Sequence, residues 1–330
     1  MPPPLTTSPA TLGLAIYGAN GHQIHRRLAN HPRARLVAFA EFPEAALPES
    51  LRGDRAIRRA ASLDEILRDD RVEMVSLCSP RRGDQARDAI RCLDAGRHVY
   101  AEKPCARSLR DLEEILQAAE KAKRKFHEMA GSAFIQPWRE MRRLIRDGTI
   151  GEVIQVVVQK SYPYRDTRPG DEAVDGGLTL QAGIHALRFV EHVAGVRVAK
   201  AECIETRLGS KRRDDLRIAS SLLLHLANGG VGTITLNYLN PPKFPTWGNE
   251  TLRVFGEKGF LEAVDGGART RLVLKDRDIS PIPLTEPDTD YLDFVVEEIL
   301  DGKPMPLRLD EELHPLRVLL RAKAAARLAE

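Results

Sequence analysis

The stretch LGLAIYGANGHQIHRRL, residues 12–28, decides the fold class. An apolar run over residues 12–17 leads into a turn-rich GANG segment, and a basic stretch with helical spacing follows. A strand that enters a glycine turn and then a helix opens the dinucleotide-binding βαβ unit, whose fingerprint is G-x-G-x-x-G. The three glycine positions of that fingerprint hold Gly18, Asn20 and Gln23. We therefore expect a dinucleotide-binding turn with an altered glycine pattern.

Two further features favour a bound dinucleotide. Asparagine accepts left-handed backbone angles more readily than most residues, so Asn20 and the extra Gly21 can still form the tight turn. Glu41 follows the second apolar run, 23 residues after Gly18 (41 − 18), close to the usual spacing of the acid that binds the ribose hydroxyls. A carboxylate there repels a 2′-phosphate, so we predict NAD as cofactor in preference to NADP. The alternative for Glu41 is a solvated glutamate at a strand end.

The length of 330 residues predicts two domains, because single cores stop growing at about 250–300 residues. Strands alternate with helices up to about residue 100, and later segments alternate like antiparallel strands. We expect an α/β protein: a disordered leader over 1–11, an NAD-binding Rossmann domain with a doubly wound parallel sheet over 12–130, and an α+β substrate and oligomerisation domain with a large, mostly antiparallel open sheet over 131–330. Its C-terminal helix can pack back on the first domain.

Individual elements follow from periodicity and capping signals. In the first domain, strands are expected at 13–17, 36–40, 74–78 and 98–101, with a capping box at Ser62–Glu65 and a helix from Ser108 to about Lys125. In the second domain, strands are expected at 152–160, 203–207, 217–226, 231–239, 251–255, 260–264 and 271–275. A helix is expected at 183–193, and Asn228-Gly229-Gly230 predicts a hairpin turn.

Charge, cysteines and hydropathy exclude several classes of protein. The formal net charge is +3, from 50 basic and 47 acidic residues, which favours neither a nucleic-acid nor a membrane partner. The arginine pairs at 81–82, 142–143 and 212–213 are expected on solvated faces. No apolar run reaches the roughly 20 residues of a membrane span. The four cysteines lack metal or disulfide spacing, and no metal-binding motif is present, so we expect a cytoplasmic protein without a metal.

A second stretch, AGRHVYAEKPCARSLRDLEEI at residues 95–115, carries a specific resemblance. It resembles the Gfo/Idh/MocA family of glucose–fructose oxidoreductase, inositol dehydrogenase and their relatives, through the string A-G-x-H-V-x-x-E-K-P at 95–104. DGTIGE at 147–152, DGGLTLQAGIH at 175–185 and the hairpin at 226–233 also match the family pattern. The resemblance extends from about residue 12 to residue 327.

The resemblance implies an NAD(P) Rossmann domain, a second open-sheet domain, and oxidation or reduction of a carbinol carbon on a sugar or polyol. It implies that Lys103 lies near the nicotinamide and the reacting hydroxyl, that His185 transfers the proton, and that Pro104 shapes the loop. An ammonium can stabilise developing alkoxide charge, and an imidazole can accept a proton near neutral pH. The alternatives are an exposed loop lysine and a core or surface histidine. The predicted cofactor-binding residues are Gly18, Asn20, Gly21, Glu41, Ser79, Pro80, Glu102 and Lys103.

The chain departs from the family pattern at three positions. Gln181 stands where the family has the aspartate that pairs with the histidine, and Arg188 stands where it usually has an acid. The segment Ser79–Asp84 lacks the histidine that the family has near the nicotinamide. An amide at 181 can orient the His185 imidazole but cannot stabilise an imidazolium, and a comparable replacement in a serine protease costs about 10⁴ in kcat.

Arginines and tyrosines suggest the substrate class. Gln181, His185, Arg188 and His192 are spaced to form one polar stripe on a helix. We favour a solvated face for His192, while Arg188 could instead face the cofactor. The hypothesis is a substrate with a carboxylate or phosphate, and its candidate contacts are Tyr162, Tyr164, Arg165, Arg168 and Arg188. A polar surface loop is the alternative for residues 160–168. The segment Tyr238–Trp247 is interpreted as a substrate-side lid or a subunit contact.

The leading functional hypothesis is an NAD-dependent oxidoreductase with Lys103 and His185 as catalytic residues, oriented by Gln181. One alternative is an NAD-dependent glycosidase or lyase that oxidises its substrate transiently. Another is a catalytically silent NAD-binding sensor or partner subunit. The expected partners are a small-molecule substrate and further copies of the chain in a homodimer or homotetramer, because one face of an open sheet needs cover. A monomer with a polar outer sheet is the alternative.

Overall fold

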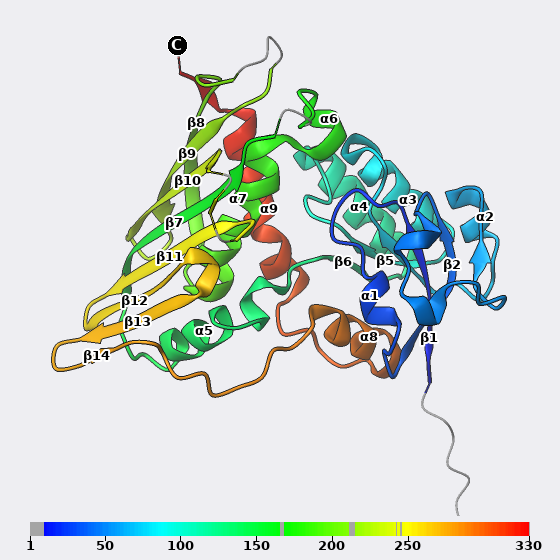
Figure 1. Cartoon of the computed structure of the whole chain (residues 1–330), viewed down its shortest axis with the longest axis horizontal. Coiled ribbons are helices and arrows are strands. Elements are labelled where there is room, and N and C mark those ends of the chain that lie inside the picture. The colour runs from blue at the N-terminus through cyan, green and yellow to red at the C-terminus, as the bar shows by residue number, and fades with distance from the viewer. Residues whose placement is uncertain (1–9, 166–167, 211–214, 242, 245, 330) are drawn as a thin grey trace, which may run out of the picture. The chain divides into compact units, whose positions relative to one another are not determined.

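The computed structural model describes residues 10–165, 168–210, 215–241, 243–244 and 246–329, which form two compact units (Figure 1). The first unit comprises Met1–Cys105, Arg110–Met129 and Leu292–Pro306, and the second comprises Ala106–Leu109, Ala130–Tyr291 and Leu307–Glu330. Most of the predicted leader and the arginine pair at 212–213 lie outside the described residues.

The first unit is built on a six-stranded parallel sheet in the order β3-β2-β1-β4-β5-β6. Its strands are β1 (Leu12–Tyr17), β2 (Ala34–Ala40), β3 (Arg58–Arg59), β4 (Met74–Leu77), β5 (His98–Ala101) and β6 (Phe126–Glu128). The chain runs outward from β1 to β3 and returns to β4 on the other side of β1. The strand order therefore reverses between β1 and β4, which is where ligands bind in doubly wound sheets.

Short and long helices connect these strands. The connecting helices are α1 (His25–Leu28), α2 (Leu63–Leu67), α3 (Gln85–Asp94) and α4 (Leu109–Ala122), with 3₁₀ turns η1 (Glu44–Ala46), η2 (Glu49–Leu51) and η3 (Arg82–Asp84). Helix α8 (Tyr291–Asp301), from later in the chain, also belongs almost entirely to this unit. The predicted doubly wound sheet and its four predicted strands are confirmed. The predicted helix to Lys125 ends earlier, at Ala122, and β6 takes up the following residues. The capping box is half formed: Ser62 accepts from the Glu65 amide, but the Glu65 carboxylate binds the amide of Ala61.

The second unit is built on a nine-stranded sheet in the order β14-β13-β12-β11-β7-β10-β9-β8-β15. Among the described strand pairs of this second sheet, β7–β10 and β8–β15 are parallel and the others are antiparallel, so the predicted mostly antiparallel sheet is confirmed. The strands are β7 (Val153–Pro163), β8 (Val198–Thr206), β9 (Ala219–Leu226), β10 (Val231–Asn240), β11 (Asn249–Gly256), β12 (Gly259–Val264), β13 (Arg269–Leu274), β14 (Asp278–Ile279) and β15 (Arg327–Leu328). The predicted hairpin is also confirmed, with Gly229 at φ 90°.

Helices cover one face of this sheet and leave the other open (Figure 1). The helices and turns are η4 (Gly131–Phe134), α5 (Trp138–Arg146), α6 (Glu172–Asp175), α7 (Gly177–Arg188), the π-helical turn η5 (Phe189–Val193), η6 (Asp265–Gly267) and α9 (Leu309–Ala324). Leu224 and Ile234 are buried on the helix side, whereas Leu223 and Val231 on the other side are 51% and 47% exposed. Side chains of β9 and β10 therefore alternate between the helix-covered core and the open face of the sheet.

Candidate functional site

The carboxyl ends of β1, β4 and β5 meet around the GANG turn. Gly18 has φ 76°, its amide donates to the Ala40 carbonyl at 3.0 Å, and a Cβ at this position would lie 2.0 Å from the Cys78 oxygen. The amide of Asn20 donates to that same Cys78 oxygen at 3.3 Å. Only glycine fits at position 18, so the tight turn expected after the first strand is present.

Gln23 stands at the third glycine position of the fingerprint, and its side chain bonds to the ends of two strands there. Its Nε2 donates to the carbonyls of Gly18 and Ser76 at 3.1 and 3.2 Å, and its Oε1 accepts from the Ser76 hydroxyl at 2.6 Å. The side-chain amide thus closes the ends of β1 and β4. The helix that follows, α1, has only four residues, with basic side chains and no acid in its first turn.

Glu102 ties the turn to the loop after β5. Its carboxylate is 1% exposed and accepts the His22 amide at 2.7 Å and the His22 Nδ1 at 3.2 Å. The Lys103 ammonium, 7% exposed, lies 3.7 Å from the same carboxylate. Burial alone would raise the pKa of Glu102, but the His22 hydrogen bond and the charges of Lys103 and Arg82 outweigh burial and lower it to about 2. The carboxylate therefore stays ionised over the working pH range.

Arg82 and Gln85 complete this network from the loop after β4. The Arg82 guanidinium donates to the carbonyl of Asn20 and to the side chain of Gln85. Gln85 in turn donates to the Glu102 carbonyl and, at 3.3 Å, to that of Pro104. The expectation of a solvated Arg82 is wrong: the side chain is 3% exposed because the three loops close over it. Because Arg82 lies in a run of basic and polar residues, the sequence alone favoured an exposed side chain.

The other predicted cofactor residues of the first unit differ in accessibility. The carboxylate of Glu41, directly after β2, is exposed, and its residue has φ 52°. Ser79 is fully buried and its hydroxyl donates to Asp88 at 2.8 Å, so its side chain serves packing, whereas Pro80 is exposed. Asn20 Nδ2 donates to the Pro80 carbonyl at 3.2 Å. Glu41 and Pro80 thus flank the turn on the surface.

In the second unit, α7 carries the remaining catalytic candidates. Gln181 and His185 are half-buried, while every other residue of α7 is buried. Arg188 is 1% exposed and His192, on η5, is 3% exposed with Nε2 2.9 Å from the Glu311 carbonyl. The predicted solvated face for His192 is therefore wrong, because η5 continues the helix into the core. Burial and the nearby Arg188 lower the pKa of His192 to about 3.

Asp175 is a residue that sequence reasoning missed. It ends α6, is 8% exposed, and its carboxylate accepts the Gly177 amide at 2.9 Å. Gln181 Nε2 donates to the Asp175 backbone carbonyl at 2.9 Å. Burial raises the pKa of Tyr238, and the negative charge of Asp175 raises it further. The only signal for Asp175 in the sequence was its position directly before two glycines, the second of which begins α7.

The predicted substrate loop and the segment Tyr238–Trp247 form one arginine–aromatic cluster. The Arg168 guanidinium lies 3.8 Å from the ring centre of Tyr238, and that of Arg165 lies 4.3 Å from the ring centre of Trp247. The Tyr162 and Trp247 rings lie 5.9 Å apart. Guanidinium groups stack on aromatic faces with favourable electrostatics, so this contact fixes both arginines. Tyr164 is half-buried.

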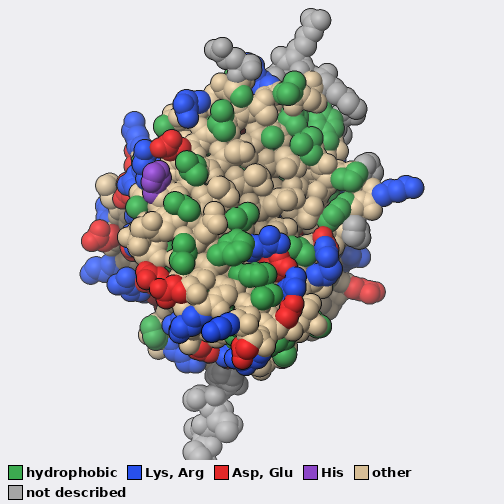
Figure 2. Space-filling view, turned by 90° about the vertical axis from the view of Figure 1, so that its left-hand side faces the viewer, with side chains coloured by type: hydrophobic (Ala, Val, Ile, Leu, Met, Phe, Trp, Pro, Cys, Tyr) green, Lys and Arg blue, Asp and Glu red, His purple; other side chains and the backbone are tan. Residues whose placement is uncertain are grey.

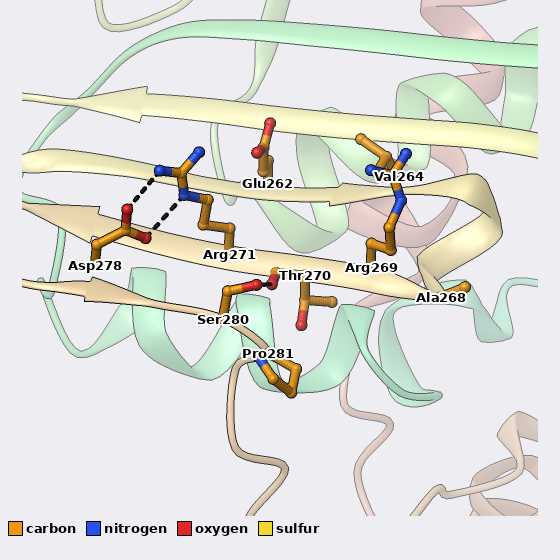
Figure 3. A pocket seen from close by; sticks show the side chains of 9 residues that line it. All are labelled: Glu262, Val264, Ala268, Arg269, Thr270, Arg271, Asp278, Ser280 and Pro281. Atoms are coloured by element: carbon orange, nitrogen blue, oxygen red, sulfur yellow. Dashed lines mark hydrogen bonds and ion pairs between the residues drawn. The ribbon is translucent and has the colours of Figure 1, made fainter.

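A separate groove of about 730 Å³ crosses β12–β14 (Figure 3). Its wall carries an ion pair in which Arg271 Nε donates to Asp278 at 2.8 Å. None of the predicted site residues lines it. The lining residues are Glu262, Val264, Ala268, Arg269, Thr270, Arg271, Asp278, Ser280 and Pro281.

Comparison with known proteins identifies the family. Residues 12–130 match the model of an oxidoreductase family with an NAD-binding Rossmann fold, and residues 138–262 match the GFO/IDH/MocA C-terminal domain. The chain belongs to the Gfo/Idh/MocA family, and the resemblance drawn from the sequence is confirmed. Within the described ranges, no helix combines the length and hydropathy that crossing a bilayer requires.

Individual relatives are distant. Myo-inositol 2-dehydrogenase of Thermotoga maritima is 24% identical over 220 residues, which cover 64% of this chain and 62% of that protein. A 1-carboxy-3-chloro-3,4-dihydroxycyclo hexa-1,5-diene dehydrogenase of Comamonas testosteroni is 27% identical over 237 residues, 68% of this chain and 57% of that protein. The chain thus matches about three fifths of the length of these relatives. The structure of an aldose–aldose oxidoreductase from Caulobacter crescentus complexed with glycerol is 25% identical, with a TM-score of 0.80 over 96% of this chain and 97% of the other.

Proposed function

We propose that the protein is an NAD-dependent dehydrogenase or reductase that transfers a hydride between nicotinamide and a carbinol or carbonyl carbon of a sugar, polyol or sugar acid. One observation carries the proposal. A nearly buried ammonium, Lys103, lies at the carboxyl end of β5 in a family Rossmann sheet, held beside the Glu102 carboxylate that also binds the dinucleotide turn. A cation in that place stabilises negative charge on a reacting oxygen.

The residues of the first unit fit a dinucleotide. Gly18 and Gly21 supply the two positive-φ positions of the turn, and the Gly18 amide bonded to Ala40 sets Glu41 directly beside it. The exposed Glu41 carboxylate suits ribose hydroxyls and opposes a 2′-phosphate, which favours NAD. The bound cofactor would supply the hydride acceptor or donor. Asn20, Pro80 and the backbone around Ser79 would border it.

Within this proposal, Lys103 polarises the substrate oxygen and His185 moves its proton. The Gln181 amide nitrogen donates to the Asp175 carbonyl, and the side chain lies one helical turn from His185, where an amide can orient an imidazole. Such an amide fixes the ring without stabilising its charge. We therefore expect slower turnover than with a carboxylate at position 181.

We propose an anionic small-molecule substrate for the second unit. The half-buried Arg168 and exposed Arg165 are held in place by Tyr238 and Trp247. Arg168 also lies 5.8 Å from the ring centre of Tyr162, and the half-buried Tyr164 precedes Arg165 in the chain. Arg188 is nearly inaccessible, so we assign it a supporting role behind the site. The Comamonas relative is named for a compound with a carboxyl group and two hydroxyls, which supports this class.

The test is a screen of matched neutral and acidic sugars and polyols with NAD and NADP, followed at the NADH absorbance. Turnover of a sugar acid with NAD, with a KM that rises in Arg168→Ala, supports the proposal. Better turnover of the neutral compounds, with an unchanged KM in Arg168→Ala, overturns the anionic class. Arg207→Ala, which removes an exposed arginine paired with Asp215, is the matched control.

Gln181 also supports a second candidate, a catalytically silent NAD-binding protein, because no carboxylate replaces the family acid at that position. Binding of NAD without turnover of any tested substrate favours it. If products form without net NADH, the transient oxidation of a glycosidase or lyase is favoured instead. Quantifying NADH against product separates these outcomes from net redox chemistry.

We further propose that the open face of the nine-stranded sheet pairs with another copy of the chain in a homodimer or homotetramer. Figure 2 shows this face with few charges over much of its area and with scattered hydrophobic side chains. Ile204, Leu223 and Val231 are 42%, 51% and 47% exposed. Light scattering tests the proposal. Leu223→Lys should yield monomers, whereas Leu284→Lys, at a 55% exposed leucine outside these strands, should leave the assembly intact.

A further inference from the structure

The joint between α6 and α7 is a pair of glycines, Gly176 and Gly177, with φ of 99° and 71°. Glycine restricts the backbone least of all residues, so contacts from outside the pair have to fix the joint. The joint matters for the proposed site because the Gln181 side chain, on α7, donates to the Asp175 carbonyl, on α6. His185 lies one helical turn beyond Gln181. Movement of α6 against α7 would therefore displace the amide relative to the imidazole.

Lys323, on the C-terminal helix α9, holds the α6 side of this joint. Its Nζ donates to Glu172 Oε1 at 2.9 Å, and both side chains are partly buried. Glu172 packs against the glycine pair, since a Cβ on Gly177 would lie 2.6 Å from its carboxylate carbon. Its backbone carbonyl accepts the Gly176 amide at 2.8 Å. The ammonium thus binds the residue that closes α6 over the joint.

The same ammonium holds the α7 side through Glu205, on β8. Lys323 Nζ lies 2.8 and 2.9 Å from the two carboxylate oxygens of Glu205, which is 5% exposed. This carboxylate also accepts the Thr179 hydroxyl, from the first turn of α7, and Arg217 Nε at 3.3 Å. Burial would raise the pKa of Glu205, but the hydrogen bonds from Lys323 and Thr179 outweigh burial and lower it. An ionised carboxylate therefore links α7 to α9.

The three N–H groups of an ammonium match the three carboxylate oxygens around Lys323, and charge-assisted hydrogen bonds of this kind are strong. We propose that Lys323 is a positioning residue for the proposed proton transfer. By holding Glu172 and Glu205 together, it fixes α6 against the first turn of α7. The Gln181 amide and the His185 imidazole then keep one relative orientation. This inference rests on the proposed function, in which His185 moves the proton.

Steady-state kinetics of the full chain, with NAD and the compound of highest kcat in the screen above, test the proposal. Each kcat is expressed per NAD-binding site counted by calorimetry, so that unfolded chains do not contribute. Lys323→Met keeps the aliphatic chain without the ammonium and should lower kcat at least about tenfold, because a displaced proton-transfer group reacts slowly. The solvent deuterium isotope effect on kcat should rise, since proton transfer then limits turnover. The Kd for NAD should stay unchanged, and Lys323→Arg, which can bridge both carboxylates, should restore most of kcat.

Arg217→Met is the matched control. Arg217 binds the same Glu205 carboxylate and the Asp215 carbonyl, neither of which belongs to α6. This variant should unfold at a lower temperature, with kcat and the isotope effect of the wild type. Glu172→Ala removes the contact of Lys323 with α6 and should lower kcat as Lys323→Met does. The double variant should lose no more kcat than either single variant, because both changes break one link.

The outcomes are distinguishable. An unchanged kcat and isotope effect in Glu172→Ala overturns the role of Lys323, even where Lys323→Met does not fold, and leaves the proposed function standing. An equal fall of kcat in Arg217→Met, or additive losses in the double variant, shows a purely structural cluster and also overturns it. If the folded wild type turns over no compound of the screen with either cofactor, the proposed function fails, and this inference fails with it.

Discussion

Gln181 and Asp175 are joined by a hydrogen bond from the Gln181 amide nitrogen to the Asp175 backbone carbonyl, 2.9 Å long. The bond fixes a neutral amide four residues before His185, at the position where the family pattern has an acid. A carboxylate at position 181 has no hydrogen to donate, so it would lose this bond and its oxygens would face the Asp175 carbonyl oxygen. Position 181 therefore carries a neutral amide that is held by a hydrogen bond, and it carries no charge.

Gln181→Asp is expected to raise kcat about tenfold, because a carboxylate one helical turn from His185 stabilises the imidazolium that forms when the proton is transferred. The acid limb of the pH–rate profile should move to higher pH. Stability should fall by about 1 kcal/mol through the lost hydrogen bond. Kinetics over pH and thermal unfolding measure both effects. Gln181→Asn, which is of the same size but neutral, is the control, and equal pH profiles for the two variants would contradict the argument.

Lys103→Met is expected to lower kcat by about 10²–10³ while changing the Kd for NAD by less than about threefold. Methionine keeps the length of the side chain but removes the ammonium that lies 3.7 Å from Glu102. Steady-state kinetics and calorimetry separate the two quantities. Lys125→Met removes a half-exposed lysine paired with Glu298 and should leave kcat unchanged. A fall confined to NAD affinity would show that Lys103 binds cofactor only.

Glu41→Arg is expected to weaken NAD binding and to strengthen NADP binding, so that their ratio changes at least about tenfold. The exposed carboxylate beside the turn favours ribose hydroxyls, and a guanidinium there would pair with a 2′-phosphate. Kd values for both cofactors measure the change. Glu49→Arg reverses an exposed charge on η2 and should leave the ratio as it is. An unchanged ratio in Glu41→Arg would place the ribose elsewhere.

The sequence predicted most strands within a few residues, because alternating or continuous apolar runs in this chain are bounded by glycines and polar turns. It placed Lys103 and Gly18 at strand ends, where ligands bind in parallel sheets. β6 was not predicted, since three residues such as Phe126–Glu128 carry too little periodicity to separate from a preceding helix.

Hydrophobic periodicity could not predict which polar side chains are buried. Arg82 lies in a polar segment and His192 on a predicted polar stripe of a helix, yet both are buried, because loops and helices distant in sequence supply their partners. The His22–Glu102 contact joins residues 80 positions apart and follows from the parallel order of β1, β4 and β5. Such contacts depend on the assembled sheet and leave no local signal.

Gly18→Ala and Gly53→Ala form a matched pair for the turn. Both glycines have positive φ, 76° and 69°, so both alanines carry backbone strain of about 1 kcal/mol. A Cβ at 18 would lie 2.0 Å from the Cys78 oxygen, whereas a Cβ at 53 meets nothing within 4 Å. Gly18→Ala is therefore expected to lower stability by a further 2–3 kcal/mol or so, and to abolish NAD binding. Denaturant unfolding measures the difference, and equal midpoints would show that the turn relaxes freely.

His192 predicts how stability responds to acid. Burial lowers its pKa from 6.5 to about 3 in the folded chain, so below pH 6.5 the unfolded chain binds a proton that the folded chain does not. Its contribution is complete above that pH and is lost as the pH falls toward 3, with a cost of about 2 kcal/mol at pH 5. His192→Gln keeps a donor for the Glu311 carbonyl and cannot titrate, so its unfolding midpoint should fall less between pH 7 and pH 5 than that of the wild type. His225→Gln, at a 55% exposed histidine, should retain the wild-type slope. If His192→Gln loses stability as steeply as the wild type over this range, the buried imidazole is not the acid-sensitive group.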